Sequence, residues 1–504
     1  MRDTNREGLI WVDHGLGPEA QWTREPDLGA IKRVCRRHLG IPEDAPEDAV
    51  AVSFHRDGAF NKLYRVDCGR RRFVLRLSLP VDPRNKTVGE AATLDLVRRK
   101  TDLPVPAVVA FDASRTSEIG YEWLLMERMP GVPAHYRWRK MTMAQKERLT
   151  ARVADFHAQL LRCGHFGDGF RGIGTLATGL PPRSGPGLGS GPGGGGTPEP
   201  GPIVSSFFFS GQRYHYPVPR GPFSSSHDWL QAQLNVIVRE HTAALAEAKT
   251  DLEREHAEST LRAARKLLRM LHRIFPAVVH PPERTVIWHD DFSLRNMLVD
   301  DSGNITAVIG WECASTMPRW VASQVPEFLR GAVRETKPDR NCYTDVDKRS
   351  ARPVVRDGSS KGRKDKKGGE DQHENEDDND DDGLDNEGKT ELYWIHLMEY
   401  EQTQLRKVYA ARMRQLRPDW DLEVEESALK VDFLGAVVRC AAGFYLRRIE
   451  QWADAVERRE YLPLMEVLRV GLQPDAAKGA KPRPSKPPAP AAGPPTPTLV
   501  SRLF

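Results

Sequence analysis

The residues best suited to chemistry lie in one short stretch, where His289, Asp291 and Asn296 follow an apolar run that ends at Trp288. The carboxylate of Asp291 can accept the proton of a hydroxyl group. The amide oxygen of Asn296 can help to hold a metal ion that bridges phosphate groups. We therefore expect a carboxylate and a metal-binding amide on one loop between two strands.

A turn cluster from Asp300 to Asn304 follows this loop and lies between two apolar, β-branched runs, a pattern that predicts a hairpin. If the chain folds back about Gly303, Asn296 faces position 310 with the two Cβ positions about 5 Å apart. An aspartate at position 310 would complete a pair of hard oxygen ligands for Mg²⁺. The chain has Gly310 instead, and Glu312 reaches the ion only if the strand geometry persists past this glycine.

The spacing from Asp291 to Asn296 is also that of the aspartate and asparagine in a kinase catalytic loop. A polar loop whose His and Asp hydrogen-bond to backbone is the simpler interpretation of so short a motif. The preceding strand, the hairpin and the terminal Trp-Glu pair all follow in kinase order, which favours the catalytic loop.

The stretch resembles the aminoglycoside phosphotransferase and choline kinase-like family, in particular its fungal branch, whose pattern continues through a hairpin to I-D-W-E-C. This chain has Ile309-Gly310-Trp311-Glu312-Cys313. Further similarity lies at 173–176, 220–223 and 320–329, so that it covers most of residues 50–470. The resemblance implies an α+β, protein-kinase-like fold with a small β-rich N-lobe and a larger, mainly helical C-lobe. It also implies that ATP and Mg²⁺ are used, that Asp291 is catalytic, and that His289 braces the loop.

The N-terminal third contains the strands that such an N-lobe needs. Alternating residues predict strands at 50–54, 62–66 and 72–77, and Gly58 and Asn61 lie in the turn between the first two. A turn in this place covers nucleotide phosphates with its N–H groups in kinases. A plain Asp-Gly hairpin explains the same residues, and the family context favours contact with phosphate.

Arg76 stands on the third strand where the kinase pattern has a lysine, and Glu90 lies in the helix that follows. The planar guanidinium can hold two phosphate oxygens or pair with a carboxylate, whereas a lysine is a point charge. We expect Arg76 to contact phosphate or to pair with Glu90. A solvated strand arginine is the alternative.

Strands are also predicted at 107–111 and 121–126, and the run from Leu125 to Gly131 follows the second of them. The resemblance implies that this run is the inter-lobe hinge, with the backbone of Glu127 to Met129 bound to adenine. A strand that ends in a Pro-Gly turn is the alternative interpretation.

Composition divides the 504 residues into structured and low-complexity parts. We expect an N-terminal extension with a helix, an N-lobe, and a C-lobe with helices at 141–163, 226–253, 261–275, 391–416 and 427–457. Segments rich in Pro, Gly, Ser or charge predict disordered inserts and a disordered tail. The boundaries are 1–49 for the extension, 50–128 for the N-lobe, 129–475 for the C-lobe, 181–202 and 349–389 for the inserts, and 476–504 for the tail.

The remaining features indicate a cytoplasmic protein. The start of the chain lacks an apolar signal segment, no apolar run reaches membrane-spanning length, and the six cysteines are dispersed. A net charge of +4 gives no reason to expect nucleic acid as a partner. A basic run at 361–367 is compatible with nuclear import, but the acidic run at 370–382, for which we have no role, would compete for its charges.

Two functions fit these observations. The first is an ATP-dependent phosphotransferase that acts on a hydroxyl of a small molecule. The second is a pseudokinase-like binding protein, because loss of the metal ligand at Gly310 would impair catalysis. The family spans aminoglycosides, choline-like amines and sugars, so the expected partner is a hydroxylated small molecule as a class.

Overall fold

The computed structural model describes residues 6–13, 17–163, 169–177, 198–277, 280–343 and 391–470. The chain divides into two compact units, one formed by Met1–Phe328 with Val408–Phe504 and the other by Leu329–Lys407. Everything that bears on the catalytic loop lies in the first unit. The predicted insert at 349–389 and the predicted tail at 476–504 lie outside the described residues.

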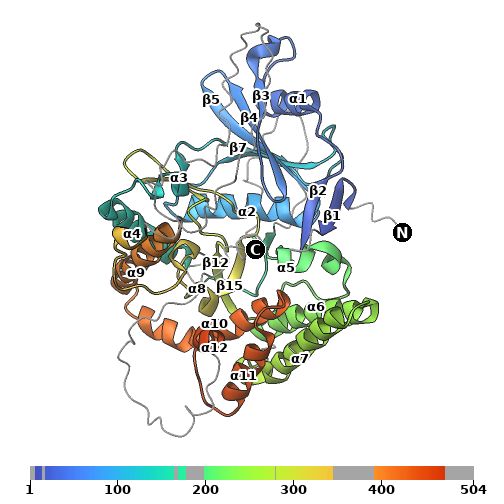
Figure 1. The fold of residues 1–504 in the computed structure, drawn as a ribbon. Coiled ribbons are helices and arrows are strands. Elements are labelled where there is room, and N and C mark those ends of the chain that lie inside the picture. The colour runs from blue at the N-terminus through green and yellow to red at the C-terminus, as the bar shows by residue number, and fades with distance from the viewer. Residues whose placement is uncertain are drawn as a thin grey trace, which may run out of the picture. The chain divides into compact units, whose positions relative to one another are not determined.

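The N-lobe is built on a five-stranded antiparallel sheet in the order β3-β4-β5-β7-β6 (Figure 1). One face packs on an apolar cluster that includes Leu75, Tyr121 and Trp123. This face is buried because alternate residues of each strand point the same way. The strands are β3 (Ala51–Asp57), β4 (Asn61–Cys68), β5 (Arg71–Ser78), β6 (Val108–Asp112) and β7 (Glu122–Glu127).

Helix α2 (Asn85–Lys100) follows β5 and carries Glu90. It lies very close to the C-lobe segment that contains Thr175, since a Cβ on Gly89 would be only 2.3 Å from Thr175 Cγ2. Thr175 is itself held by a 2.9 Å hydrogen bond between its hydroxyl and that of Ser315, and its Oγ1 accepts from Val204 N. The Ile-Gly-Thr-Leu motif at 173–176 thus fixes the position of α2.

The N-terminal extension contains more than the helix expected from the sequence. Strands β1 (Leu9–Asp13) and β2 (Pro18–Trp22) form an antiparallel hairpin, and α1 (Leu28–His38) and a short 3-10 turn, η2 (Glu47–Ala49), come after it. Asp27 caps α1 by accepting hydrogen bonds from Gly29 N and Ala30 N.

The C-lobe is mainly helical, as predicted, and two of its short sheets contribute the strands on either side of the catalytic loop. β8 (Val132–Pro133), β13 (Met297–Val299) and β14 (Ile305–Val308) form one sheet, and β9 (Phe170–Arg171), β12 (Arg284–Trp288) and β15 (Ser315–Pro318) form another. A third sheet pairs β10 (Leu176–Ala177) with β11 (Glu199–Pro200). Residues 181–197 of the predicted insert lie outside the described residues, and its C-terminal end differs from the prediction because residues 199–200 form a strand.

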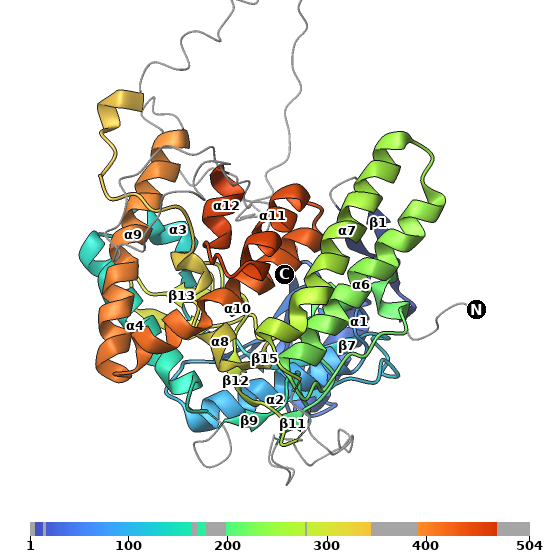
Figure 2. The ribbon, with the colours of Figure 1, turned by 90° about the horizontal axis from the view of Figure 1, so that it is seen from below.

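Several of the predicted helix boundaries are wrong, including the starts predicted at 261 and 427, which lie at Asp251 and Trp420. The helix expected at 226–253 ends at Glu247, and a new helix starts at Asp251 behind a capping box formed by Thr250 and Glu253. The helix expected at 427–457 is broken before Leu446, where Tyr445 adopts a left-handed conformation with φ of 58°. Figures 1 and 2 both show α6 and α7 side by side. The helices are α3 (Ala134–Trp138), α4 (Met143–Leu160), α5 (Ser206–Phe209), α6 (Ser226–Glu247), α7 (Asp251–Ile274), α8 (Arg319–Ala322), α9 (Glu391–Leu416), α10 (Trp420–Ala441), α11 (Leu446–Glu457) and α12 (Leu464–Val470), with 3-10 turns η4 (Gly211–His215), η5 (Glu327–Leu329) and η6 (Arg340–Tyr343).

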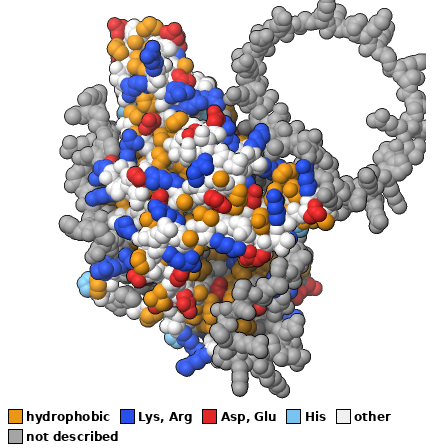
Figure 3. All heavy atoms as spheres, turned by 90° about the vertical axis from the view of Figure 1, so that its left-hand side faces the viewer, with side chains coloured by type: hydrophobic (Ala, Val, Ile, Leu, Met, Phe, Trp, Pro, Cys, Tyr) orange, Lys and Arg blue, Asp and Glu red, His pale blue; other side chains and the backbone are white. Residues whose placement is uncertain are grey.

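The surface shown in Figure 3 carries Lys and Arg side chains interspersed with Asp and Glu, in keeping with the near balance of charge in the sequence. Among the helices of the described residues, none has the length and apolarity needed to cross a membrane.

Candidate active site

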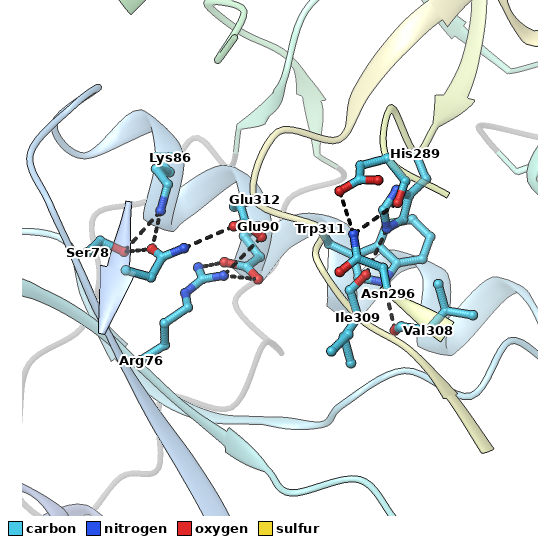
Figure 4. Close-up of polar contacts among 12 residues, drawn as sticks. Arg76, Ser78, Lys86, Glu90, His289, Asn296, Val308, Ile309, Trp311 and Glu312 are labelled. Atoms are coloured by element: carbon cyan, nitrogen blue, oxygen red, sulfur yellow. Dashed lines mark hydrogen bonds and ion pairs between the residues drawn. The ribbon is translucent and has the colours of Figure 1, made fainter. Parts of the chain in front are cut away.

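The candidate site consists of two polar clusters that are joined by the segment from Ile309 to Glu312 (Figure 4). One cluster belongs to the catalytic loop between β12 and β13. The other belongs to β4, β5 and α2 of the N-lobe. Each cluster makes its own hydrogen bonds to the joining segment, so that the short stretch after β14 ties the two lobes together at this point.

In the catalytic loop, Asn296 orients the carboxylate of Asp291. The amide Nδ2 of Asn296 donates to Asp291 Oδ2 at 2.8 Å and to the Asp291 backbone oxygen at 3.0 Å. Both acceptors are oxygens, which fixes the orientation of the amide and leaves Oδ1 of Asn296 directed elsewhere. The sequence placed these two residues on one loop, and the structure brings their side chains into contact.

His289 braces the end of β14 from beneath the loop. Its side chain is buried, and its Nε2 lies 2.9 Å from the carbonyl oxygen of Ile309. Since a carbonyl can only accept, Nε2 carries the proton. The ring also packs edge-on against Trp311, with 4.5 Å between the centroids. Burial is the main cause that lowers the pKa of His289, which favours the neutral ring in this bracing position.

Position 310 lies beside Asn296, as the hairpin argument predicted. An ideal Cβ at Gly310 would be 2.7 Å from Asn296 Nδ2 and 2.8 Å from Oδ1. The register differs by one residue from the predicted one, because Met297 pairs with Val308 and Ile309 N donates to the Asn296 carbonyl. The turn is centred near residue 302 instead of Gly303, since Val299 pairs with Ile305, and an irregularity between Leu298 and Val299 then moves the pairing one residue toward the predicted register. Gly310 has φ of +81°, a conformation that glycine adopts without strain.

In the N-lobe, Arg76 forms a buried ion pair with Glu90. This pairing was one of the two contacts predicted for Arg76, the other being with phosphate. Arg76 NH1 donates to Glu90 Oε1 at 2.6 Å, and NH2 contacts the second carboxylate oxygen. The two side chains are 5% and 3% exposed. NH1 also donates to Glu312 Oε2 at 3.3 Å, so one guanidinium contacts two carboxylates, one from each lobe.

Glu312 therefore lies against the N-lobe in this structure, and its use as a metal ligand stays a prediction. Besides Arg76, its carboxylate accepts a 2.9 Å hydrogen bond from Asn61 Nδ2. Burial would raise the pKa of Glu312, but the positive charges of Arg76 and Lys86 outweigh burial and lower it. Glu312 is thus held as a carboxylate.

Lys86 is the residue of this cluster that sequence reasoning missed. It lies on α2, is 1% exposed, and donates to Asn61 Oδ1 at 2.5 Å and to Ser78 Oγ at 3.2 Å. Its burial, followed by repulsion from Arg76, lowers its pKa to about 8. The local sequence gave no signal, because Asn85-Lys86-Thr87 is an ordinary polar start for a helix.

The predicted phosphate-covering turn is closed by a hydrogen bond from Gly58 N to Asn61 O at 2.8 Å. Phe60, in the same turn, packs edge-on against Phe209 of α5 with 5.1 Å between ring centroids. The turn is therefore anchored on the C-lobe. Its contact with phosphate stays a prediction, and Asn61 points its side chain toward Glu312 and Lys86.

At the predicted hinge, Glu127 N donates to Ala107 O at 2.9 Å and Arg128 N donates to Arg72 O at 3.1 Å. Within the described residues, the N–H of Met129 makes no hydrogen bond to another backbone group. Binding of the adenine edge by the N–H of Met129 stays a prediction.

Acidic side chains gather near Asp291. Burial raises the pKa of Asp290 to about 7, and the charges of Asp291 and Glu312 raise it further. Even so, no group of three or more His, Cys, Asp or Glu side chains in the described part of the chain is arranged to hold a metal ion.

The residues present do not fit a magnesium site with two protein ligands. Asn296 Oδ1 is one candidate ligand atom, Gly310 has no side chain, and the Glu312 oxygens accept from Arg76 and Asn61. A Mg²⁺ ion usually takes one or two carboxylates together with phosphates and water. We therefore assign no step of the reaction to a metal ion held by this chain.

Sequence comparison gives the family. Residues 51–321 match the phosphotransferase enzyme family, which is over half of the chain. The chain belongs to this family, as the resemblance of its catalytic loop predicted, and it has the protein-kinase-like α+β fold of the family.

Individual relatives are distant. The chain is 22% identical over 316 residues to a subtelomeric hrmA-associated cluster protein of Aspergillus fumigatus, across 54% of this chain and 59% of that protein. It is 25% identical over 128 residues to altered inheritance of mitochondria protein 9 of Meyerozyma guilliermondii, across 24% of this chain and 21% of that protein. The chain thus spans about 59% of the length of the Aspergillus relative that it matches. Among solved structures, aminoglycoside phosphotransferase APH(4)-Ia is 14% identical, with 84% of this chain and 98% of that chain covered and a TM-score of 0.39.

Proposed function

We propose that this protein is an ATP-dependent phosphotransferase that transfers a phosphoryl group to a hydroxyl of a small molecule. The observation that carries the proposal is the hydrogen bond between Asp291 and Asn296. The Asp291 carboxylate is half-buried, and it is held by the amide of Asn296, which directly precedes β13. A carboxylate fixed in this way can accept a hydroxyl proton without first paying for its own reorientation.

In the proposed reaction, the substrate hydroxyl oxygen forms a bond to the γ-phosphorus of ATP while the bond from that phosphorus to the bridging oxygen breaks. ADP leaves, and the hydroxyl proton passes to Asp291 Oδ1, since Oδ2 already accepts from Asn296. His289 holds Ile309, and thereby the end of the hairpin, against the loop. Phosphoryl transfer depends mostly on positioning and charge stabilisation, which is what these contacts provide.

The nucleotide would lie between the hinge and the N-lobe cluster. Met129 N–H would bind the adenine edge, and the turn with Gly58 would cover the phosphates. Arg76, which is buried and held by Glu90, would contribute a positive charge fixed in place before the nucleotide arrives. The relative APH(4)-Ia has been solved with ADP and hygromycin B, and for this chain we propose a hydroxylated small molecule in the cytoplasm as the acceptor.

A pseudokinase is the second candidate, and a specific observation favours it. Gly310 removes the carboxylate expected at the metal site, and its φ of +81° shows a backbone that suits glycine. Such a protein would bind nucleotide but would transfer phosphate slowly or not at all.

The test is ATP consumption by the purified full-length protein across a panel of hydroxylated small molecules, including aminoglycosides, choline and sugars. The proposal predicts consumption that depends on one class of acceptor and is lost in Asp291→Asn. Nucleotide binding without consumption for any acceptor would favour the pseudokinase, and absence of both would contradict both candidates.

A further inference from the structure

Lys86 is a buried cation without a carboxylate in hydrogen-bond contact. It is 1% exposed, and the two partners of its ammonium group, Asn61 Oδ1 and Ser78 Oγ, are neutral. Other lysines and arginines of the N-lobe interior are paired directly, as Arg76 is with Glu90 and Lys62 is with Glu25. A charge buried among neutral groups costs free energy, and such residues are found preferentially at functional sites.

The position of Lys86 relates it to the phosphate region. Asn61, which accepts from Lys86, is the first residue after the turn that contains Gly58, and its amide also donates to Glu312. Asn61 thus connects Lys86, through its Oδ1, with Glu312, through its Nδ2, and both of these residues are labelled in Figure 4. Two of the three N–H groups of the ammonium are used within the described residues, which leaves the third for a ligand.

The negative charge of the nucleotide phosphates gives a reason for a cation in the proposed nucleotide site. A family member with an aspartate at position 310 would use a metal ion there to neutralise phosphate, and this chain has Gly310. Arg76 alone cannot neutralise the phosphate charge, because its own charge is already offset by contacts with Glu90 and Glu312.

We propose that Lys86 is a phosphate-binding residue that takes over charge neutralisation from the metal ion that Gly310 does not hold. A phosphate oxygen of the nucleotide accepts from the third N–H of the ammonium group, while Asn61 Oδ1 and Ser78 Oγ keep the other two. This inference rests on the proposed nucleotide site and adds that binding there depends little on a divalent ion.

The test is calorimetric titration of the full-length protein with adenosine and with ATP, in Mg²⁺ and in EDTA. Lys86→Met removes the charge at similar volume, and Lys86→Arg keeps it. Lys62→Met is the matched control, because Lys62 is also buried in β4 but pairs with Glu25 outside the cluster. Thermal unfolding of each variant shows whether it is folded.

We expect Lys86→Met to lower ATP affinity by about ten- to hundredfold, which is the usual worth of a charged hydrogen bond, and to leave adenosine affinity unchanged. Lys86→Arg should retain most of the ATP affinity, Lys62→Met should resemble the wild type, and EDTA should change wild-type ATP affinity only a few-fold.

The inference is overturned if Lys86→Met binds ATP like the wild type, or if EDTA abolishes ATP binding by the wild type. The second measurement decides the matter even if Lys86→Met fails to fold. If the wild type binds neither adenosine nor ATP, the proposed nucleotide site is wrong and this assignment falls with it.

Discussion

The two clusters on either side of the segment 309–312 differ in how their charges are partnered. In the catalytic loop, Asp291 is half-buried and is held by a neutral amide. In the N-lobe, Arg76 and Glu90 are 5% and 3% exposed and hold each other directly. The loop thus keeps a carboxylate accessible for a substrate proton, whereas the N-lobe fixes its charges before any ligand arrives. Under the proposed mechanism, the difference separates the residue that reacts from the residues that position charge.

The largest effect is expected for the reactive carboxylate. Asp291→Asn is nearly isosteric but cannot take a proton, so acceptor-dependent ATP turnover should fall about 10²–10⁴-fold while the melting temperature stays close to that of the wild type. The matched control is Asp301→Asn, because the Asp301 side chain is 90% exposed on the hairpin turn. Equal turnover in both variants would remove Asp291 from the mechanism.

Substitutions in the N-lobe cluster should lower the free energy of unfolding. Glu90→Gln leaves Arg76 buried with a weakened partner, and loss of one member of a buried pair costs about 3–5 kcal/mol in the free energy of unfolding. Asp95→Asn on the same helix breaks a pair with the half-exposed Arg99 and should cost less than about 0.5 kcal/mol. Denaturant unfolding measures both. Similar losses for the two variants would show that burial does not distinguish them.

The lowered pKa of Lys86 predicts how the free energy of unfolding depends on pH. Its pKa is lowered from 10.5 to about 8 in the folded protein, mainly by burial, so the folded state favours the neutral amine. This contribution to stability is fully present above pH 10.5 and is lost as pH falls through 8. The wild type should therefore gain about 3 kcal/mol relative to Lys86→Met between pH 8 and 10.5. Arg76, Glu312, Cys313 and Glu122 also act on this lysine, and the difference between the two proteins isolates its titration. Parallel stability curves would contradict a lowered pKa.

The smallest effect is expected at position 310. Gly310→Asp should restore a second ligand beside Asn296 and raise ATP affinity in Mg²⁺ about tenfold over EDTA, once the Asn296 side chain shifts to make room for a Cβ that would otherwise lie 2.7 Å from its Nδ2. The positive φ costs stability for any side chain, of order 1–2 kcal/mol, so Gly310→Ala is the control for strain. A folded Gly310→Asp protein without a gain in Mg²⁺ dependence would refute the pairing with Asn296 as a metal site.

The sequence predicted the features that depend on a local residue pattern or on the pairing of two strands in one hairpin. It gave the sheet of the N-lobe, the partnership of Arg76 with Glu90 and the position of residue 310 beside Asn296. The shift of register after Leu298 depends on a local irregularity that alternation cannot reveal. The sequence predicted two helices here but placed the break between residues 253 and 261, whereas the capping box of Thr250 and Glu253 starts the second helix at Asp251.

Lys86 was missed for a different reason. Its hydrogen-bond partners Asn61 and Ser78 lie on β4 and β5, and the charges of Glu312 and Cys313 act on it from the segment after β14. These segments are far apart in the sequence, so no periodicity or motif around residue 86 could indicate it. Sites built from several elements are in general those that a single sequence describes least well.

The central claim is that a nucleotide binds between the hinge and the two clusters with its terminal phosphate near both Asp291 and Lys86. A crystal structure of the protein with a non-hydrolysable ATP analogue tests this most directly. The account predicts the adenine edge on the N–H of Met129, the terminal phosphate in hydrogen-bond contact with the Lys86 ammonium group, and Asp291 facing that phosphate across the space for an acceptor hydroxyl. A nucleotide bound elsewhere, or one whose phosphates lie away from both Lys86 and Asp291, would contradict it.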